Sequence, residues 1–298
     1  MSLVFLIGNM KNCVNKSIGI ILPIVLFLLF SYASAQQKQI ESRDAEFYYN
    51  RGTAYYHKGQ YDQAISDFNK ALEINPRLTD AYYNRGFVYD KKGQYAQAIS
   101  DYTKALEINP RYADAYNNRG KAYYEKGQYD QAISDLNKAL EINARNAEVY
   151  NNRGNIYYRK GQYDQAISDY TKALEINPRC AMFHYHRGNA YGAKGHYDRA
   201  ISNFSKAIEI NPKYAQAYGN RGLAYGKKGQ YNLAISDFSK AIEINPNEAD
   251  AYYDRGVTYY NKREYDKSWD DVHKAQELGY QVPPKFLDDL RKASIRKN

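Results

Sequence analysis

Cysteine, tryptophan and long apolar runs are scarce in this chain. Its 298 residues include two Cys, Cys13 and Cys180, and one Trp, which excludes a disulfide framework and a zinc site built from several thiolates. The mean hydropathy of −0.79 excludes a polytopic membrane protein. The sequence contains no phosphate-binding glycine loop, nucleophile elbow or H-E-x-x-H segment. We therefore expect no enzymatic activity, no cofactor and no bound metal.

Tyrosine is unusually abundant, with 34 residues against 10 Phe. Apolar residues make up 44% of the chain and charged residues 25%, which excludes a wholly disordered protein. The formal net charge is +9. A residue type used this unevenly indicates that a few positions recur many times along the chain.

The first 35 residues have the layout of a secretory signal peptide. Lys11 and Lys16 precede an apolar run at 18–30, and small residues lead to Ala35. We predict cleavage after Ala35 and a secreted or periplasmic mature protein. The run is shorter than the ~20 residues that cross a bilayer, so no stable membrane span is expected in the mature chain. An uncleaved segment that anchors the protein to a membrane stays open as the alternative.

A period of 34 residues runs through the rest of the sequence. Its clearest marker is a glycine that recurs at this spacing without insertion, at Gly52, Gly86, Gly120, Gly154, Gly188, Gly222 and Gly256. Ala64 recurs in step through six copies, and Pro76 marks the end of a copy. A fixed period of this size indicates stacked supersecondary units. Positions within the repeat are counted from Ala45 as position 1.

Each period is typical of a pair of helices. Tyr48, Gly52 and Tyr55 lie four and three residues apart, on one face of a helix that Gly59 ends. The apolar residues within 64–71 repeat this spacing before a proline stops the second helix. One such pair cannot bury its apolar face alone, so stacked pairs share one continuous core.

These observations predict an organisation of four parts. They are a signal peptide at 1–35, a short linker at 36–44, seven repeats at 45–78, 79–112, 113–146, 147–180, 181–214, 215–248 and 249–282, and a capping helix with a basic tail at 283–298.

The repeat resembles the tetratricopeptide repeat. The residues on its signature positions are Tyr48, Gly52, Tyr55, Ala64, Phe68, Ala71 and Pro76. The resemblance covers residues 45–282 and implies an all-α fold, a right-handed α-solenoid of seven helix-turn-helix units closed by the C-terminal helix. It also implies a protein–protein interaction scaffold, which we expect to be monomeric.

Asparagine and tyrosine on the first helices are the candidate peptide-binding residues. In tetratricopeptide arrays the first helices line a groove, and the resemblance places positions 5, 6 and 12 there. A carboxamide can bond any peptide group, and helices about 10 Å apart would present one Asn to about every third residue of an extended segment. The set is Asn50, Asn84, Asn118, Asn152 and Asn220 at position 6, Tyr49, Tyr83, Tyr185 and Tyr253 at position 5, and Tyr56, Tyr124, Tyr158 and Tyr260 at position 12.

Two simpler interpretations of these residues stay open. The tyrosines could serve packing between neighbouring first helices, and the asparagines could have been copied along by duplication without a use. His186 and Asp254 interrupt the asparagine series at position 6 in the fifth and seventh repeats.

An arginine at position 7 departs from the family pattern, which more often has an aliphatic residue there. It recurs at Arg51, Arg85, Arg119, Arg153, Arg187, Arg221 and Arg255. An Asp recurs 16 residues later in six of the repeats, and Asn203 replaces it in the fifth. We predict a structural Arg–Asp ion pair within each repeat.

Two other function classes remain alternatives. One is a structural component of an envelope complex that docks through the convex face or the C-terminal helix. The other, more remote, is a helical repeat that binds nucleic acid; no nucleic acid partner is expected, because the basic residues form no stripe.

Overall fold

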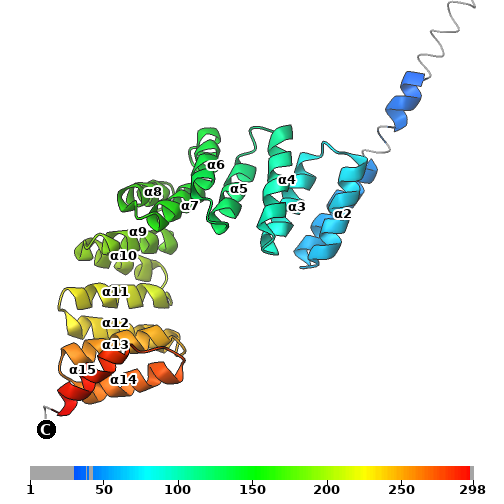
Figure 1. The fold of residues 1–298 in the computed structure, drawn as a ribbon. Helices are drawn as coiled ribbons and strands as arrows, with labels where there is room; N and C mark the ends of the chain where they lie inside the picture. Colours follow the sequence, from blue (N-terminus) through cyan, green and yellow to red (C-terminus); the bar gives the residue numbers. More distant parts are fainter. Residues whose placement is uncertain (1–29, 38, 40–42, 296–298) are drawn as a thin grey trace, which may run out of the picture. The chain divides into compact units, whose positions relative to one another are not determined.

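The computed structural model describes residues 30–37, 39 and 43–295, and the regular structure within them is helical. The predicted signal peptide therefore lies outside the described residues except for 30–35, and the last three residues of the predicted tail lie outside them too. The helices of the repeats form pairs (Figure 1). The pairs are 43–57 with α2 (Tyr61–Ile74), α3 (Thr79–Lys91) with α4 (Tyr95–Ile108), α7 (Ala147–Arg159) with α8 (Tyr163–Ile176), α9 (Ala181–Ala193) with α10 (Tyr197–Ile210), α11 (Ala215–Lys227) with α12 (Tyr231–Ile244), and α13 (Ala249–Asn261) with α14 (Tyr265–Glu277). Helices α5 (Ala113–Glu125) and α6 (Tyr129–Ile142) follow α4 along the chain.

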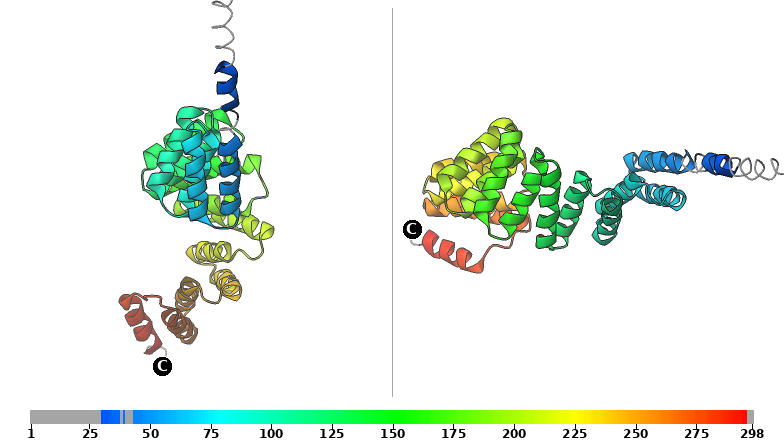
Figure 2. Two further views of the ribbon diagram at one scale, coloured as in Figure 1. Left: turned by 90° about the vertical axis from the view of Figure 1, so that its right-hand side faces the viewer. Right: turned by 90° about the horizontal axis from the view of Figure 1, so that it is seen from above.

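The chain divides into two compact units, 1–122 and 123–298, and the division falls within α5. In the first unit α3 packs against both α2 and α4. In the second, each helix from α6 to α14 packs against the next one along the chain (Figure 2). The first helices of successive repeats also touch, α7 with α9, α9 with α11 and α11 with α13. They form a surface that we call the first-helix face, made by positions 5, 6, 9, 12 and 13 of the first helices.

The glycine at position 8 sets how closely the two helices of a pair approach. A Cβ built on Gly52 would lie 2.9 Å from the Phe68 ring, and one on Gly154 would lie 2.7 Å from the Tyr170 ring. Side chains do not tolerate such distances, so any larger residue would push the helices apart. At Gly52 and Gly154 the period-34 glycine is therefore required because a ring of the second helix packs where its Cβ would be.

A second recurring glycine, at position 15, ends the first helix in the left-handed region. The φ angle is 72° at Gly59 and 76° at Gly195, values that cost little only for glycine. In the seventh repeat Arg263 holds the same position with φ 62°. The last repeat thus keeps the left-handed backbone conformation at position 15 but has no glycine there.

Helix α15 (Pro284–Ile295) covers the end of the second unit. Leu290 is fully buried against Val272 and Val282, and the Trp269 Nε1 donates a hydrogen bond of 3.1 Å to the Ser294 hydroxyl. Within the described residues, no helix combines the length and the apolar content that a membrane crossing requires.

Candidate peptide-binding site

Asparagine at position 6 and tyrosine at position 5 are brought together across neighbouring repeats. The Asn side chain donates from Nδ2 to the hydroxyl of the Tyr on the preceding first helix, 35 residues earlier in the chain. The three bonds join Asn84 to Tyr49 at 3.0 Å, Asn118 to Tyr83 at 2.9 Å, and Asn220 to Tyr185 at 3.1 Å. Each bond fixes one carboxamide plane relative to the neighbouring helix.

The remaining members of position 6 differ in their surroundings. Asn50 is exposed, and Asn152 is half-buried on α7. His186 on α9 lies 2.7 Å, through Nδ1, from the Asn151 Oδ1, and burial lowers the pKa of His186 to about 4. Its imidazole is therefore neutral at pH 7.

Two asparagines of this series have a side-chain carbonyl oxygen that is not used in hydrogen bonding within the described residues. The Oδ1 atoms of Asn84 and Asn220 accept no hydrogen bond from any described residue, whereas the two N–H groups of Asn220 are used by Tyr185 and Asn189. Both asparagines line cavities on the first-helix face. A carbonyl oxygen held in this way can accept a bond from a backbone N–H.

The position 5 tyrosines are also held by aromatic contacts. Tyr83, Tyr185 and Tyr253 each lie against a tyrosine ring from the loop that ends their repeat, with ring centroids 4.8, 4.9 and 4.5 Å apart. Burial is the main cause that raises the pKa of Tyr253. The contacts hold these rings in place, which suits a surface that binds without losing much side-chain entropy.

The position 12 tyrosines pack against the first residue of the following helix. Centroid distances are 6.1 Å for Tyr56 with Tyr61, 5.8 Å for Tyr124 with Tyr129, 5.5 Å for Tyr158 with Tyr163 and 5.8 Å for Tyr260 with Tyr265. Tyr56, Tyr124 and Tyr158 line cavities of the first-helix face as well. These three tyrosines therefore pack against the following helix and also form part of the first-helix face.

Position 9 belongs to the face but was missed by the sequence reasoning. Thr53 and Phe87 line a cavity of about 180 Å³ in the first unit, and Asn155 and Asn189 line one of about 370 Å³ in the second. Leu223 lines two cavities beside α11. Position 9 differs in nearly every repeat, so a search for recurring residues does not find it.

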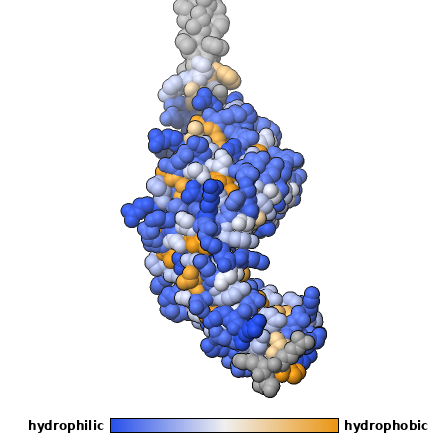
Figure 3. All heavy atoms as spheres, turned by 90° about the vertical axis from the view of Figure 1, so that its left-hand side faces the viewer, coloured by the Kyte–Doolittle hydropathy of each residue, from blue (hydrophilic) through white to orange (hydrophobic). Residues whose placement is uncertain are grey.

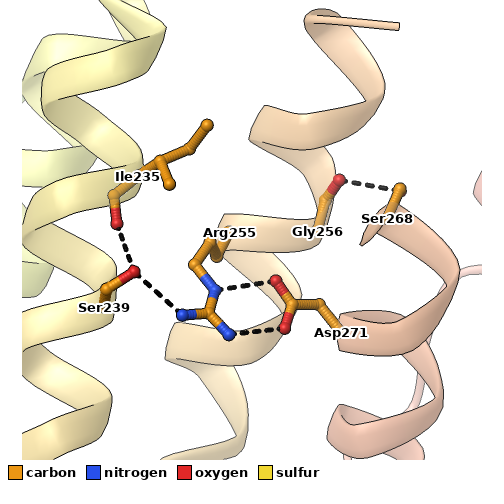
Figure 4. Close-up of polar contacts among 6 residues, drawn as sticks. All are labelled: Ile235, Ser239, Arg255, Gly256, Ser268 and Asp271. Atoms are coloured by element: carbon orange, nitrogen blue, oxygen red, sulfur yellow. Dashed lines mark hydrogen bonds and ion pairs between the residues drawn. The ribbon is translucent and has the colours of Figure 1, made fainter. Parts of the chain in front are cut away.

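The position 7 arginine connects three helices. The Arg255 Nε and Nη2 donate to the two carboxylate oxygens of Asp271 at 2.8 and 2.7 Å, and Nη1 donates to the hydroxyl of Ser239 in the preceding repeat at 2.9 Å (Figure 4). Ser239 in turn donates to the backbone carbonyl of Ile235. We call this arrangement the arginine bracket.

The bracket recurs along both units. The two-fold bond to Asp is present at Arg51, Arg85, Arg153 and Arg221, and the bond to position 25 of the preceding repeat is present at Arg85, Arg119, Arg153, Arg187 and Arg221. The bracket lies between the helices and away from the cavities, so its role is structural.

The fifth repeat is the exception. Arg187 donates to the Oδ1 of Asn203 at 2.9 Å and to the Thr171 hydroxyl at 3.1 Å, both neutral groups. Burial lowers the pKa of Arg187, whereas bonds to a carboxylate raise that of Arg221. The guanidinium of the fifth repeat is thus half-buried beside neutral partners.

Two other kinds of feature could mark a binding site, a cluster of metal-ligating side chains and a large apolar surface patch. Among the described residues, no group of three or more His, Cys, Asp or Glu side chains is placed to hold a metal ion. On the face drawn in Figure 3, hydrophobic residues form small separate patches in a mainly hydrophilic surface. The cavities of the first-helix face are therefore the strongest candidates for a binding site.

Comparison with known families agrees with the repeat pattern. Family models described as tetratricopeptide repeat match residues 45–78, 147–180 and 215–248, and 68–100 and 238–270; a further model described as TPR repeat matches 90–127, 120–161 and 188–229. No curated protein sequence matches the chain.

Several solved structures are similar to this chain. A tetratricopeptide repeat protein from Parabacteroides merdae has 23% identity and a TM-score of 0.64, over 85% of this chain and 99% of that one. MamA has 31% identity and a TM-score of 0.52, over 58% and 94% of the two chains. YrrB, described as a TPR protein with an unusual peptide-binding site, has 28% identity and a TM-score of 0.53, over 62% and 95%.

Proposed function

We propose that this chain, which belongs to the tetratricopeptide repeat family, is an exported interaction scaffold that holds an extended segment of a partner protein on its first-helix face. The observation that carries the proposal is the asparagine series at position 6. Its carboxamides are oriented by tyrosine hydroxyls of the preceding repeat, and two of them keep a carbonyl oxygen available beside a cavity. The peptide-binding site in the name of YrrB supports the same kind of ligand.

The chemistry of the face favours a backbone over a particular side chain as the common point of recognition. The first helices α7, α9, α11 and α13 each touch the next one in this order, so equivalent residues repeat at about 10 Å. An extended segment advances roughly 3.3 Å per residue, and every third peptide group therefore meets the same position of the next repeat. Side chains at positions 9 and 12 differ between repeats and would read the side chains in between.

The test compares capture of partners from a cell extract by three forms of the protein. One variant replaces Asn50, Asn84, Asn118, Asn152 and Asn220 by Ala. The control replaces Tyr49, Tyr83 and Tyr185 by Phe, which removes the same Asn–Tyr bonds but keeps every carboxamide. We expect the alanine variant to lose at least about tenfold in recovery and the phenylalanine variant to keep most of it.

Equal recovery by all three forms would remove the asparagines from the mechanism. Equal loss in both variants, with a lower melting temperature in both, would mean that the Asn–Tyr bonds serve packing; equal loss with unchanged melting temperatures would mean that the carboxamides bind only when the tyrosine hydroxyls orient them.

Export is the second part of the proposal and rests on residues 1–35. The expected mature chain begins at Gln36 and is found outside the cytoplasm. Cell fractionation with mass determination of the N-terminus tests it, and a chain that retains residues 1–35 inside the cell would contradict it.

A further inference from the structure

Two glycines open the first-helix face over α9 and α11. Position 12, a tyrosine in four repeats, is Gly192 in α9 and Gly226 in α11. Neither is required by the backbone, because neither has a positive φ. A Cβ on Gly226 would meet nothing within 4 Å, and one on Gly192 would lie 3.8 Å from the Ala200 Cβ, an ordinary contact. A side chain would therefore fit at both positions, and glycine disfavours a helix, so neither helix stability nor close packing explains the two glycines.

These glycines leave a cavity on each side of α11. The cavity between α9 and α11 has a volume of about 310 Å³ and that between α11 and α13 about 410 Å³. Leu223 lines both and is 42% exposed. Phe204 and Tyr197 form further walls of the first cavity. An apolar cavity of about 150 Å³ holds a benzene molecule, so this one has room for a bulky apolar side chain.

The second cavity has a negatively charged wall. Asp254 lines it, and its carboxylate has no hydrogen bond or ion pair with any described residue. Asp250 lies one turn earlier on α13 and likewise has no ion pair among the described residues. Burial, and after it the charge of Asp250, raises the pKa of Asp254 to about 6, and no cation offsets this effect. Lys227 lines both cavities at the end of α11 but is not among the charges that act on Asp254.

We propose that α9, α11 and α13 select a partner segment with a bulky apolar side chain and, three residues away, a Lys or Arg. The apolar side chain enters the α9–α11 cavity beside Leu223, and the basic side chain reaches Asp254 in the α11–α13 cavity. The spacing follows from cavities about 10 Å apart on neighbouring first helices and from a segment extended in the polyproline II conformation, which rises about 3.1 Å per residue and turns every third side chain to the same face. This selectivity rests on the proposed function, because it assumes that the segment is extended on the first-helix face.

The test is a selection of random decapeptides displayed on phage against the full chain, followed by fluorescence anisotropy with labelled synthetic versions of the enriched peptides. We expect enrichment of Phe, Leu, Ile, Met or Trp with Lys or Arg three positions away, in either direction. Replacing the basic residue by Glu, or the apolar residue by Ala, is expected to weaken binding at least about tenfold.

The protein variants separate the two contacts. Asp254→Asn keeps the side-chain shape and removes the charge, so the preference for a basic residue should disappear while the apolar one remains. Gly192→Tyr restores the tyrosine of the other repeats in the α9–α11 cavity only, so the apolar preference should disappear while the basic one remains, without a lower melting temperature. Asp270→Asn, an exposed carboxylate on α14, is the matched control and should change nothing.

Enriched peptides without this pattern, no enrichment at all, or unchanged binding by both variants would each overturn the selectivity. The broader proposal is decided separately, by the asparagine and tyrosine variants in the capture experiment. A protein that captures its partner through the asparagines but does not prefer the apolar and basic residues would refute the selectivity and leave the proposed function supported.

Discussion

Two tyrosines at position 24 show how the same buried side chain can be bonded or unbonded. Tyr102 and Tyr170 are 0% and 1% exposed. The Tyr170 hydroxyl donates to the Asn155 Oδ1 at 2.8 Å, whereas the Tyr102 hydroxyl has no partner among the described residues. The difference lies at position 9 of the same repeat, where Phe87 cannot accept a hydrogen bond.

We therefore expect opposite effects from the same substitution at these two positions. Tyr170→Phe should lower the free energy of unfolding by about 1 kcal/mol, because it removes a satisfied hydrogen bond. Tyr102→Phe should leave it unchanged or raise it by about 1 kcal/mol, because a buried hydroxyl without a partner is removed. Urea unfolding at pH 7 measures both, and a larger loss for Tyr102→Phe would contradict this account.

At the scale of helices, the arginine bracket joins a first helix to its own second helix and to the second helix of the repeat before, as at Arg85 and Arg255. Six of the position 7 arginines also lie over the ring of the position 4 tyrosine, with the guanidinium carbon 5.2 to 5.7 Å from the ring centroid. The fifth repeat has neither the carboxylate nor that ring, since Asn203 and His184 stand in those positions. It is therefore the weakest bracket among those described.

Restoring the carboxylate should strengthen this repeat. Asn203→Asp is expected to raise the free energy of unfolding by about 1–2 kcal/mol, because an ion pair replaces a bond to a neutral acceptor at a half-buried guanidinium. The reverse change at the equivalent site, Asp237→Asn, should cost about 3 kcal/mol, since it removes one partner of a largely buried pair. Denaturant unfolding of the two variants beside the wild type measures this, and an Asn203→Asp protein no more stable than the wild type would refute it.

The helices themselves could be predicted from the sequence, because local signals fix both ends of each one. The position 15 glycine and the proline that closes most repeats stand where the helices end. The Asn–Tyr bonds could not be predicted, because the partners belong to different repeats and a period shows what recurs without showing which side chains meet. The cavities at Gly192 and Gly226 depend on departures from the period and became visible only with their neighbours in place.

At the scale of the whole molecule, stability in a repeat array is roughly a sum of terms for each repeat and each interface. His186 and Asp254 contribute opposite terms as the pH falls. Burial lowers the pKa of His186 to about 4, so the unfolded chain binds its proton first and stability falls between pH 6.5 and 4. Burial raises the pKa of Asp254 to about 6, so the folded chain binds its proton first and stability rises between pH 6 and 4.

Single variants should show how each of the two residues changes stability with pH. His186→Asn is expected to gain stability on acidification from pH 6 to 4, and Asp254→Asn to lose it. The wild type should lie between them, each contribution being about 3 kcal/mol at most. Melting temperatures followed by circular dichroism from pH 4 to 7.5 test this, and parallel profiles for the three proteins would contradict it.

The arginine bracket also bears on how such a gene can change length. A 34-residue copy brings its own Arg and Asp, and the new Arg finds the hydroxyl or amide that the preceding copy already carries at position 25. Gain or loss of whole 34-residue units therefore leaves every arginine at the junction with its hydrogen-bond acceptors. An insertion or deletion of another length would leave an arginine without them. Unequal recombination in register can lengthen or shorten the array and let positions 9 and 12 diverge afterwards.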